Sequence, residues 1–260
     1  MKNNNKFRLD VWGAITLGTI ALYALFLLYP MAYLIRQSVL DPDTGSFTLA
    51  YFTKFFSKSY YFDTLINSFK VSITATVLSI AIGTPLAYLF TIFKIKGKSV
   101  LNILIVVASM SAPFIGAYSW ILLLGRSGII TTFFKNLGIA IPDIYGFGGI
   151  VLVMTLQLFP LVFLYAKGAL KNIDNSLIEA AENLGCSGIA CFFKVVVPLI
   201  MPTLLAAALL VFMRSFADFG TPMLIGEGYR TFPVVLYTEF INEVGGSDGF
   251  AAAIAVIAIV

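Results

Sequence analysis

The chain has 260 residues, of which 59% are hydrophobic and 12% charged, whereas an ordinary soluble domain carries roughly a quarter charged residues. This composition predicts a polytopic membrane protein. The chain has no histidine, which excludes histidine-dependent zinc sites and Ser-His or Cys-His catalysis. Its net charge of +4 is not gathered into one patch, so nucleic acid is not an expected partner and the lipid bilayer is.

Five apolar runs are long enough to cross a bilayer, which needs about 20 apolar residues in a helix. They cover Val11 to Ile35, Leu65 to Phe93, Val100 to Leu124, Gly148 to Ala166 and Pro198 to Met213. The first is predicted to be a retained helix, because it is longer than the apolar region of a signal peptide. Pro85, Pro113 and Pro160 lie inside three of the runs, where each frees a carbonyl and permits a bend.

A sixth apolar run begins at Phe250 and continues to Val260. As a helix it would measure about 16 Å, roughly half of the hydrocarbon core. We therefore expect a sixth helix that is cut short, and a sequence that is a fragment or the front half of a longer protein.

Lysine and arginine gather on one side of the predicted spans, and this asymmetry predicts orientation because basic residues favour the cytoplasmic side. That side carries nine basic residues against four acidic ones, whereas the other side is near neutral. The nine are Lys2, Lys6, Arg8, Lys94, Lys96, Lys98, Lys167, Lys171 and Lys194, and the four are Asp10, Asp174, Glu179 and Glu182. The amino terminus is therefore predicted to be cytoplasmic.

A polar elbow, residues 174 to 198, interrupts the apolar runs on this same side. Ser176 and Glu179 form a predicted capping box at the start of a short helix that ends at Gly185. Ser187 is predicted to cap a second short helix that ends before Pro198, where the next span begins. Such a helix-turn-helix is either a docking element for another protein or an interfacial hairpin without a partner. Its two cysteines, Cys186 and Cys191, are predicted to be reduced packing residues.

The elbow resembles the EAA loop of the permease subunits of binding-protein-dependent ABC importers. In that pattern E-A-A is followed by a glycine and then by a closing I-x-L-P. Here Glu179, Ala180, Ala181, Gly185 and Pro198 fall in register, while Val195 and Val197 stand where the family has Ile and Leu. The flanking segments from Asn67 onward resemble the same family over roughly three quarters of the chain.

The resemblance implies a polytopic helical bundle of the type I ABC importer permease kind, with about six transmembrane helices and the sixth truncated. It implies one permease domain over residues 1–260, with a core at about 65–260, the N-terminal helix at 11–35 and a cytoplasmic coupling loop at about 174–198. Such a chain is a multi-pass subunit of the bacterial cytoplasmic (inner) membrane and not an enzyme. It binds no cofactor or metal, since ATP and Mg belong to its ATPase partner.

The resemblance also implies partners and a cargo. The expected partners are a cytoplasmic ABC ATPase dimer docked on the elbow, a periplasmic or lipid-anchored substrate-binding protein, and a second permease half that is fused, separate or identical. The segment from Arg214 to Phe240 resembles permeases for ferric iron first, and those for aminoethylphosphonate, polyamines and thiamine to a lesser extent. Ferric iron is therefore the expected cargo, with the other three as alternatives.

Arg214 and Asp218 stand one helical turn apart near the end of the fifth run. Ionisable groups at membrane depth usually face a cavity or a partner. The two either pair with each other near the outer interface or line the outer end of the translocation path.

Two other classes of membrane protein fit this sequence less well. A secondary transporter is expected to show an inverted repeat and ionisable residues near the midplane, and the sequence shows neither. An integral membrane enzyme needs an acid–base or metal constellation, and the spans carry no clustered carboxylates.

Overall fold

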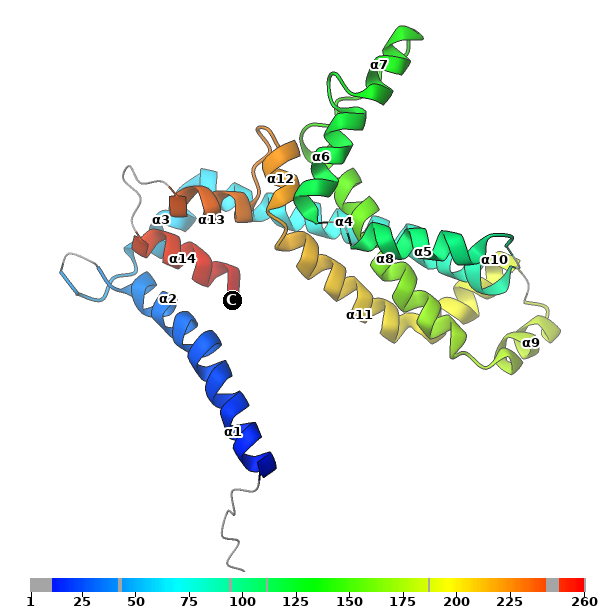
Figure 1. Cartoon of the computed structure of the whole chain (residues 1–260), viewed down its shortest axis with the longest axis horizontal. Helices are drawn as coiled ribbons and strands as arrows, with labels where there is room; N and C mark the ends of the chain where they lie inside the picture. Colours follow the sequence, from blue (N-terminus) through cyan, green and yellow to red (C-terminus); the bar gives the residue numbers. More distant parts are fainter. Residues whose placement is uncertain are drawn as a thin grey trace, which may run out of the picture. The chain divides into compact units, whose positions relative to one another are not determined.

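The computed structural model describes residues 11–41, 44–93, 95–110, 112–186, 188–241 and 248–259. Within them the chain is helical almost throughout, and the β pairing consists of an isolated bridge between Leu40 and Phe47 (Figure 1). The all-α fold class predicted from the apolar runs is confirmed.

The helices follow one another with short connections. They are α1 (Val11–Tyr23), the π-helical turn η1 (Ala24–Leu28), α2 (Tyr29–Val39), α3 (Ala50–Ser57), α4 (Ser59–Ile92), α5 (Lys98–Ser109), α6 (Pro113–Leu124), α7 (Ile129–Asn136), α8 (Phe147–Lys171), α9 (Asn175–Asn183), α10 (Gly188–Cys191), the π-helical turn η2 (Phe192–Val196), α11 (Val197–Phe216), α12 (Gly220–Ile225), α13 (Phe232–Ile241) and α14 (Asp248–Ile259).

Five stretches are long and apolar enough to cross a membrane, as the sequence predicts, although their bounds differ from the prediction. They are Val11–Val39, Ser59–Ile92, Pro113–Asn136, Phe147–Lys171 and Gly188–Phe216.

The predicted span from Val100 to Leu124 is wrong as a single helix. Helix α5 ends at Ser109 and α6 begins at Pro113. Ala112 is extended, with φ −67° and ψ 141°, because a residue that precedes proline is driven out of the helical region. Pro113 consequently opens a helix, where its missing N–H costs nothing, whereas Pro85 and Pro160 lie inside α4 and α8 as predicted.

Both π-helical turns end two residues before a proline. The N–H of Tyr29 binds the carbonyl of Ala24 ahead of Pro30, and the N–H of Val197 binds the carbonyl of Phe192 ahead of Pro198. Proline cannot donate a hydrogen bond and its ring crowds the carbonyl four residues earlier. The wider i→i+5 turn accommodates each proline, so the helix continues through it.

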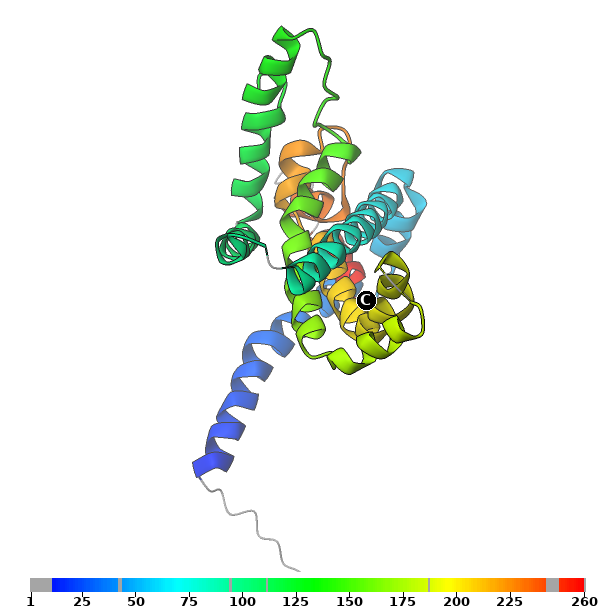
Figure 2. The same cartoon turned by 90° about the vertical axis from the view of Figure 1, so that its right-hand side faces the viewer.

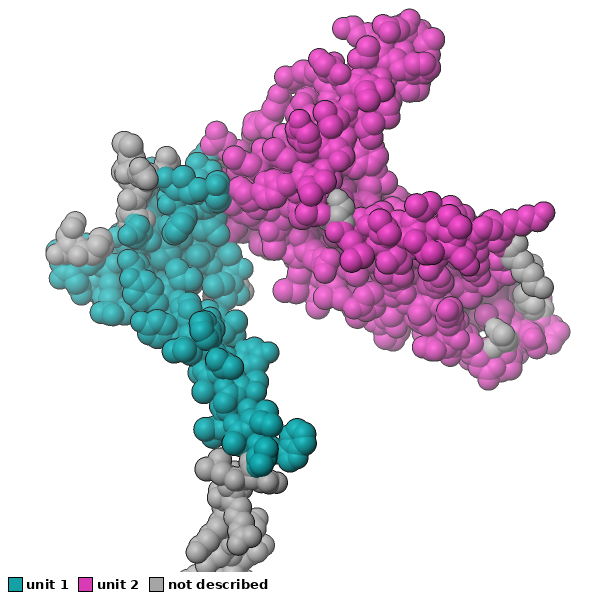
Figure 3. Space-filling view, in the orientation of Figure 1, with its two compact units in different colours: residues 1–62, 236–260 teal, residues 63–235 magenta. Residues whose placement is uncertain are grey.

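The chain divides into two compact units, which are drawn in different colours in Figure 3. Unit 1 contains residues 1–62 and 236–260, and unit 2 contains residues 63–235. Helices α4 and α13 each run from one unit into the other.

In unit 1, α14 packs on α2 and α3. Phe55 is buried and stacks on Tyr61, whose ring in turn meets Phe250 of α14 edge-on with centroids 5.0 Å apart. The hydroxyl of Tyr61 donates a hydrogen bond to Oε1 of Glu239 over 3.1 Å. These aromatic contacts hold the first turn of α14 in place, whereas α1 has no buried residue.

In unit 2, α8 is the central helix, and α5, α6, α11 and α12 pack on it. The turn into α9 follows the last residue of α8, while α7 and α12 lie toward the opposite end of α8 (Figures 1 and 2). One apolar cluster, around Phe163 and Ile200, joins the second half of α8 to α4, η2 and α11. Another, around Met154 and Ile225, joins the first half of α8 to α4, α6 and α12.

Helices α4 and α8 approach each other closely at Gly83. A Cβ atom at this position would lie 2.8 Å from the carbonyl oxygen of Phe159 and 2.9 Å from Cβ of Val162. Only glycine leaves room for the two backbones, as is common where membrane helices pack on small residues.

Candidate functional site

The elbow begins with α9, whose first turn is capped by Asp174. Oδ1 of Asp174 accepts a hydrogen bond of 2.9 Å from the N–H of Ser176. Hydrogen bonds from the backbone and side chain of Ser176 hold the pKa of Asp174 below its usual value. The predicted capping box of Ser176 and Glu179 is wrong, because α9 already begins at Asn175 and the carboxylate just before it takes the cap.

The end of α9 has the geometry predicted for it. Gly185 adopts the left-handed conformation, with φ +85°, and the N–H of Cys186 binds the carbonyl of Ala181 over 3.0 Å. This six-to-one hydrogen bond is the mark of a Schellman cap, which glycine favours because it lacks a Cβ. Within the described part of the chain neither Cys186 nor Cys191 forms a disulfide, and Cys191 is buried.

The second half of the elbow departs from the prediction. Ser187, the predicted cap of the second helix, lies outside the described residues. That helix does not stop before Pro198, because α10 continues through η2 into α11 as one stretch from Gly188 to Phe216. The π-helical turn at Phe192–Val196 carries the helix past the proline and removes the predicted break.

The outer surface of the elbow is apolar at several positions. Leu177, Leu184, Ile189 and Phe193 expose 50%, 89%, 77% and 64% of their surface, respectively. Helix α9 packs on η2 and α10, and Ile178 packs on the apolar cluster around Phe163. Of the motif residues, Glu179, Ala180, Gly185 and Pro198 are exposed, and Ala181 is half-buried.

The second predicted pair, Arg214 and Asp218, does not form an ion pair. Asp218 instead accepts hydrogen bonds from the N–H of Gly220 at 2.9 Å, the N–H of Thr221 at 3.4 Å and the hydroxyl of Thr221 at 2.7 Å. The chain turns at Ala217 to enter α12, and this turn directs the carboxylate toward the first N–H groups of that helix. Burial raises the pKa of Asp218, although the three hydrogen bonds partly oppose this shift.

Arg214 and Asp218 line one cavity of about 470 Å³ in unit 2. Its wall combines the break between α5 and α6, the middle of α8, and the turn from α11 to α12. The lining residues are Ser109, Pro113, Phe114, Gln157, Leu158, Arg214, Ala217, Asp218, Phe219 and Gly220. The two residues thus share a cavity without pairing, and their place in a translocation path stays a prediction.

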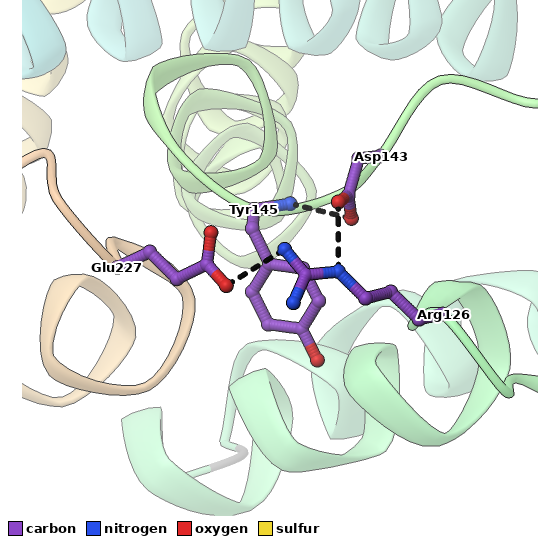
Figure 4. A network of polar contacts seen from close by, with 4 residues as sticks. All are labelled: Arg126, Asp143, Tyr145 and Glu227. Carbon is purple, nitrogen blue, oxygen red and sulfur yellow. Dashed lines mark hydrogen bonds and ion pairs between the residues drawn. The ribbon is translucent and has the colours of Figure 1, made fainter.

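A polar cluster around Arg126 joins three connections of unit 2 (Figure 4). The guanidinium binds Oδ2 of Asp143 through Nε at 3.1 Å and Oε1 of Glu227 through a terminal nitrogen at 2.8 Å. It also lies over the ring of Tyr145, with Cζ 4.8 Å from the centroid. Glu227 has a positive φ of 48°, an uncommon conformation for a residue with a side chain.

Sequence reasoning missed both this cluster and Gln157. Arg126, Asp143 and Glu227 lie far apart in the sequence, on the near-neutral side of the predicted spans, and no local pattern joins them. Gln157 carried a weak signal, since it is a lone amide within an apolar run. Gln157 lines the cavity only because the chain turns from α11 into α12 beside it, and the local sequence pattern does not predict the position of that turn.

Comparison with known proteins identifies the family. The sequence profile of the family described as "Binding-protein-dependent transport system inner membrane component" matches residues 46–260. The chain belongs to this family. This permease is thus a multi-pass membrane component of a transport system, in agreement with the resemblance seen in the elbow.

Individual relatives are similar at modest identity. The permease is 28% identical to the "Ferric transport system permease protein FbpB" of Actinobacillus pleuropneumoniae over 95% of its own length and 35% of the relative's. It is 29% identical to the "Spermidine/putrescine transport system permease protein PotB" of Haemophilus influenzae over 96% of its own length and 89% of the relative's. The chain thus spans about a third of the length of the ferric relatives that it matches.

The solved structures agree on the fold. A chain of a bacterial alginate ABC transporter, crystallised with an alginate pentasaccharide-bound periplasmic protein, superposes with a TM-score of 0.75 at 16% identity. The match covers 96% of the permease and 90% of that chain. The permease therefore shares its fold with a chain of that ABC transporter.

Proposed function

We propose that this permease is the membrane subunit of an ATP-driven ABC importer that moves ferric iron across the cytoplasmic membrane. The observation that carries the proposal is the elbow: a short, glycine-capped helix with the E-A-A pattern and an exposed apolar surface, in a chain of this family. Similarity to the ferric transport permeases supports iron as the cargo.

In this proposal the elbow docks in a groove of a cytoplasmic ABC ATPase dimer. Leu177, Leu184 and Ile189 supply apolar contact, and Ala180 is small enough for a partner's backbone to approach closely. Exposed side chains of this size outside the membrane cost free energy until a partner covers them. ATP-driven closure of the dimer would then move α11, because α10, η2 and α11 form one continuous helix.

The proposed orientation places the amino terminus and the elbow in the cytoplasm. Lys96, Lys98, Lys167 and Lys171 lie at the ends of α4, α5 and α8 that meet near the elbow. This basic bias supports the orientation through the preference of lysine and arginine for the cytoplasmic side. A periplasmic or lipid-anchored binding protein would deliver the cargo at the other end, and a second permease half would complete the path.

The test is uptake of labelled ferric iron by cells that lack the full-length gene, with the wild type or a variant restored. We expect Glu179→Arg to abolish uptake and to release the ATPase from the purified complex. Asp63→Arg, which makes the same change of charge at an exposed site far from the elbow in sequence, is the control and should behave as wild type. If Glu179→Arg retains both ATPase binding and uptake, the coupling role is refuted.

A polyamine is the second candidate cargo, because the spermidine/putrescine permease relative matches over most of its length. Labelled spermidine in the same cells separates the two cargoes. Uptake of spermidine that depends on the gene, without uptake of iron, would replace iron by a polyamine and leave the importer assignment in place.

A further inference from the structure

The cavity at the break between α5 and α6 contains one basic side chain and one acidic side chain, but their environments differ. The carboxylate of Asp218 is bound by three donors from its own turn, the N–H of Gly220 and the N–H and hydroxyl of Thr221. These hydrogen bonds use the acceptor capacity that a cationic cargo would need. Burial raises the pKa of Asp218, and the three hydrogen bonds partly oppose this shift.

The basic group of the cavity has no such partner. Arg214 is exposed and forms no ion pair with the described acidic residues, whereas Arg126 binds two of them. Its guanidinium carries donors in a fixed fork that matches the oxygens of carboxylate and phosphate groups.

A second donor comes from the middle of α8. Gln157 lines the same cavity, and its buried Nε2 has no hydrogen-bond partner among the described residues. A buried amide without a partner costs free energy, so a turn of this amide that brings Nε2 to a ligand oxygen in the cavity is favoured. Arg214 and Gln157 thus give the cavity two groups that donate to the same kind of ligand.

We propose that this cavity is a transit site for oxyanions, which Arg214 and Gln157 recognise through phosphate or carboxylate oxygens. The inference rests on the proposed import function and specifies the chemical form of its cargo. Ferric iron passes this site as a complex with an oxyanion ligand, not as the bare cation. A bare cation or a polyamine would meet the charge of Arg214, and the carboxylate among the described lining residues, that of Asp218, already accepts three hydrogen bonds, which disfavours both.

The experiment follows both parts of the cargo at once. The full importer is reconstituted in liposomes with its binding protein, which is loaded with ⁵⁵Fe in the presence of ³²P-phosphate or, in a parallel series, ¹⁴C-citrate. We expect iron and one of the two labelled anions to accumulate together in a fixed ratio. The two series distinguish phosphate from carboxylate as the source of the oxygens.

Each other outcome separates this inference from the proposed function. Accumulation of ⁵⁵Fe alone overturns the inference and leaves iron import standing. Accumulation of a labelled anion without iron keeps the transit site and refutes iron as the cargo. Uptake of labelled spermidine instead, or ATP hydrolysis by the complex with no label accumulated, overturns both.

Variants assign the effect to the cavity. Arg214→Gln should lower the uptake of both labels by about tenfold or more, because it removes a charged donor. Arg214→Lys, which keeps the charge, should recover much of the loss, and Gln157→Leu should lower uptake whereas Gln157→Asn lowers it less. Thermal unfolding of each purified variant, and its co-purification with the ATPase, report whether it is folded and assembled. Uptake by Arg214→Gln at or above the wild-type rate would overturn the inference.

Discussion

Gly83 offers the sharpest test of the packing between α4 and α8. In Gly83→Ala the new Cβ would lie 2.8 Å from the carbonyl oxygen of Phe159, 2.9 Å from Cβ of Val162 and 3.0 Å from the N atom of Phe163. None of these atoms is the end of a flexible side chain, so we take the upper part of the usual overpacking cost, about 3 kcal/mol. Alanine recovers about 1 kcal/mol through its helix propensity. The net loss of stability is about 2 kcal/mol.

The measurement is thermal unfolding of the purified permease in lipid nanodiscs, followed by the fluorescence of Trp120, which packs on the cluster around Met154. A loss of about 2 kcal/mol should lower Tm by about 4–8 °C in a chain of this size. Gly168→Ala is the matched control, since it lies in α8 with nothing within 4 Å of its added Cβ, and it should raise Tm by a few degrees. Equal Tm changes in the two variants would refute the close crossing at Gly83.

Three further predictions concern the polar contacts of unit 2 and the elbow. Arg126→Glu should speed hydrogen exchange of the loop around Glu227, and adding Glu227→Arg should restore protection. The ion pair is expected to contribute about 0.2–1 kcal/mol, because it is exposed and screened by salt. Equal exchange rates in the single and double variants would contradict the contact. Asp174→Ala should speed hydrogen exchange in α9, because the helix loses its cap. In the wild type the same loss of protection should appear as pH falls through the lowered pKa of Asp174, since only the carboxylate form caps the helix. Protection of α9 in the variant should show no such pH dependence. Thr221→Val should lower stability by about 1–2 kcal/mol in thermal unfolding because Asp218 loses a buried donor, and Thr221→Ser should not.

Much of the fold follows from local pattern. Apolar runs of about 20 residues predict the membrane helices, because the bilayer removes every other way to satisfy the backbone. The errors occur at prolines. Pro113 breaks a predicted helix and Pro198 fails to break one, and the difference is a π-helical turn before Pro198 that residue type alone does not specify.

In the candidate site, too, local features could be predicted from the sequence and contacts between distant segments could not. Gly185 could be predicted from sequence, because the left-handed cap is a local need of a glycine at the end of a short helix. The hydrogen-bond partners of Asp218 could not be predicted from sequence. Arg214 and Asp218 are spaced one helical turn apart, and only the end of the helix at Ala217 separates them. Contacts between distant segments, such as Arg126 with Glu227, depend on the packing of α6 and α12.

The π-helical turn before Pro198 fixes the rotational setting of the elbow on the membrane helix. One extra residue in a turn rotates everything before it by about 100° relative to a regular α-helix. Deleting a single residue from Phe192–Val196 would therefore turn Ile189 to another face of the helix, and it would also return Pro198 to a regular α-helical turn, which proline disrupts. A chimaera that exchanges elbows between related permeases keeps the direction of the exposed apolar surface only if the turn and its proline move together.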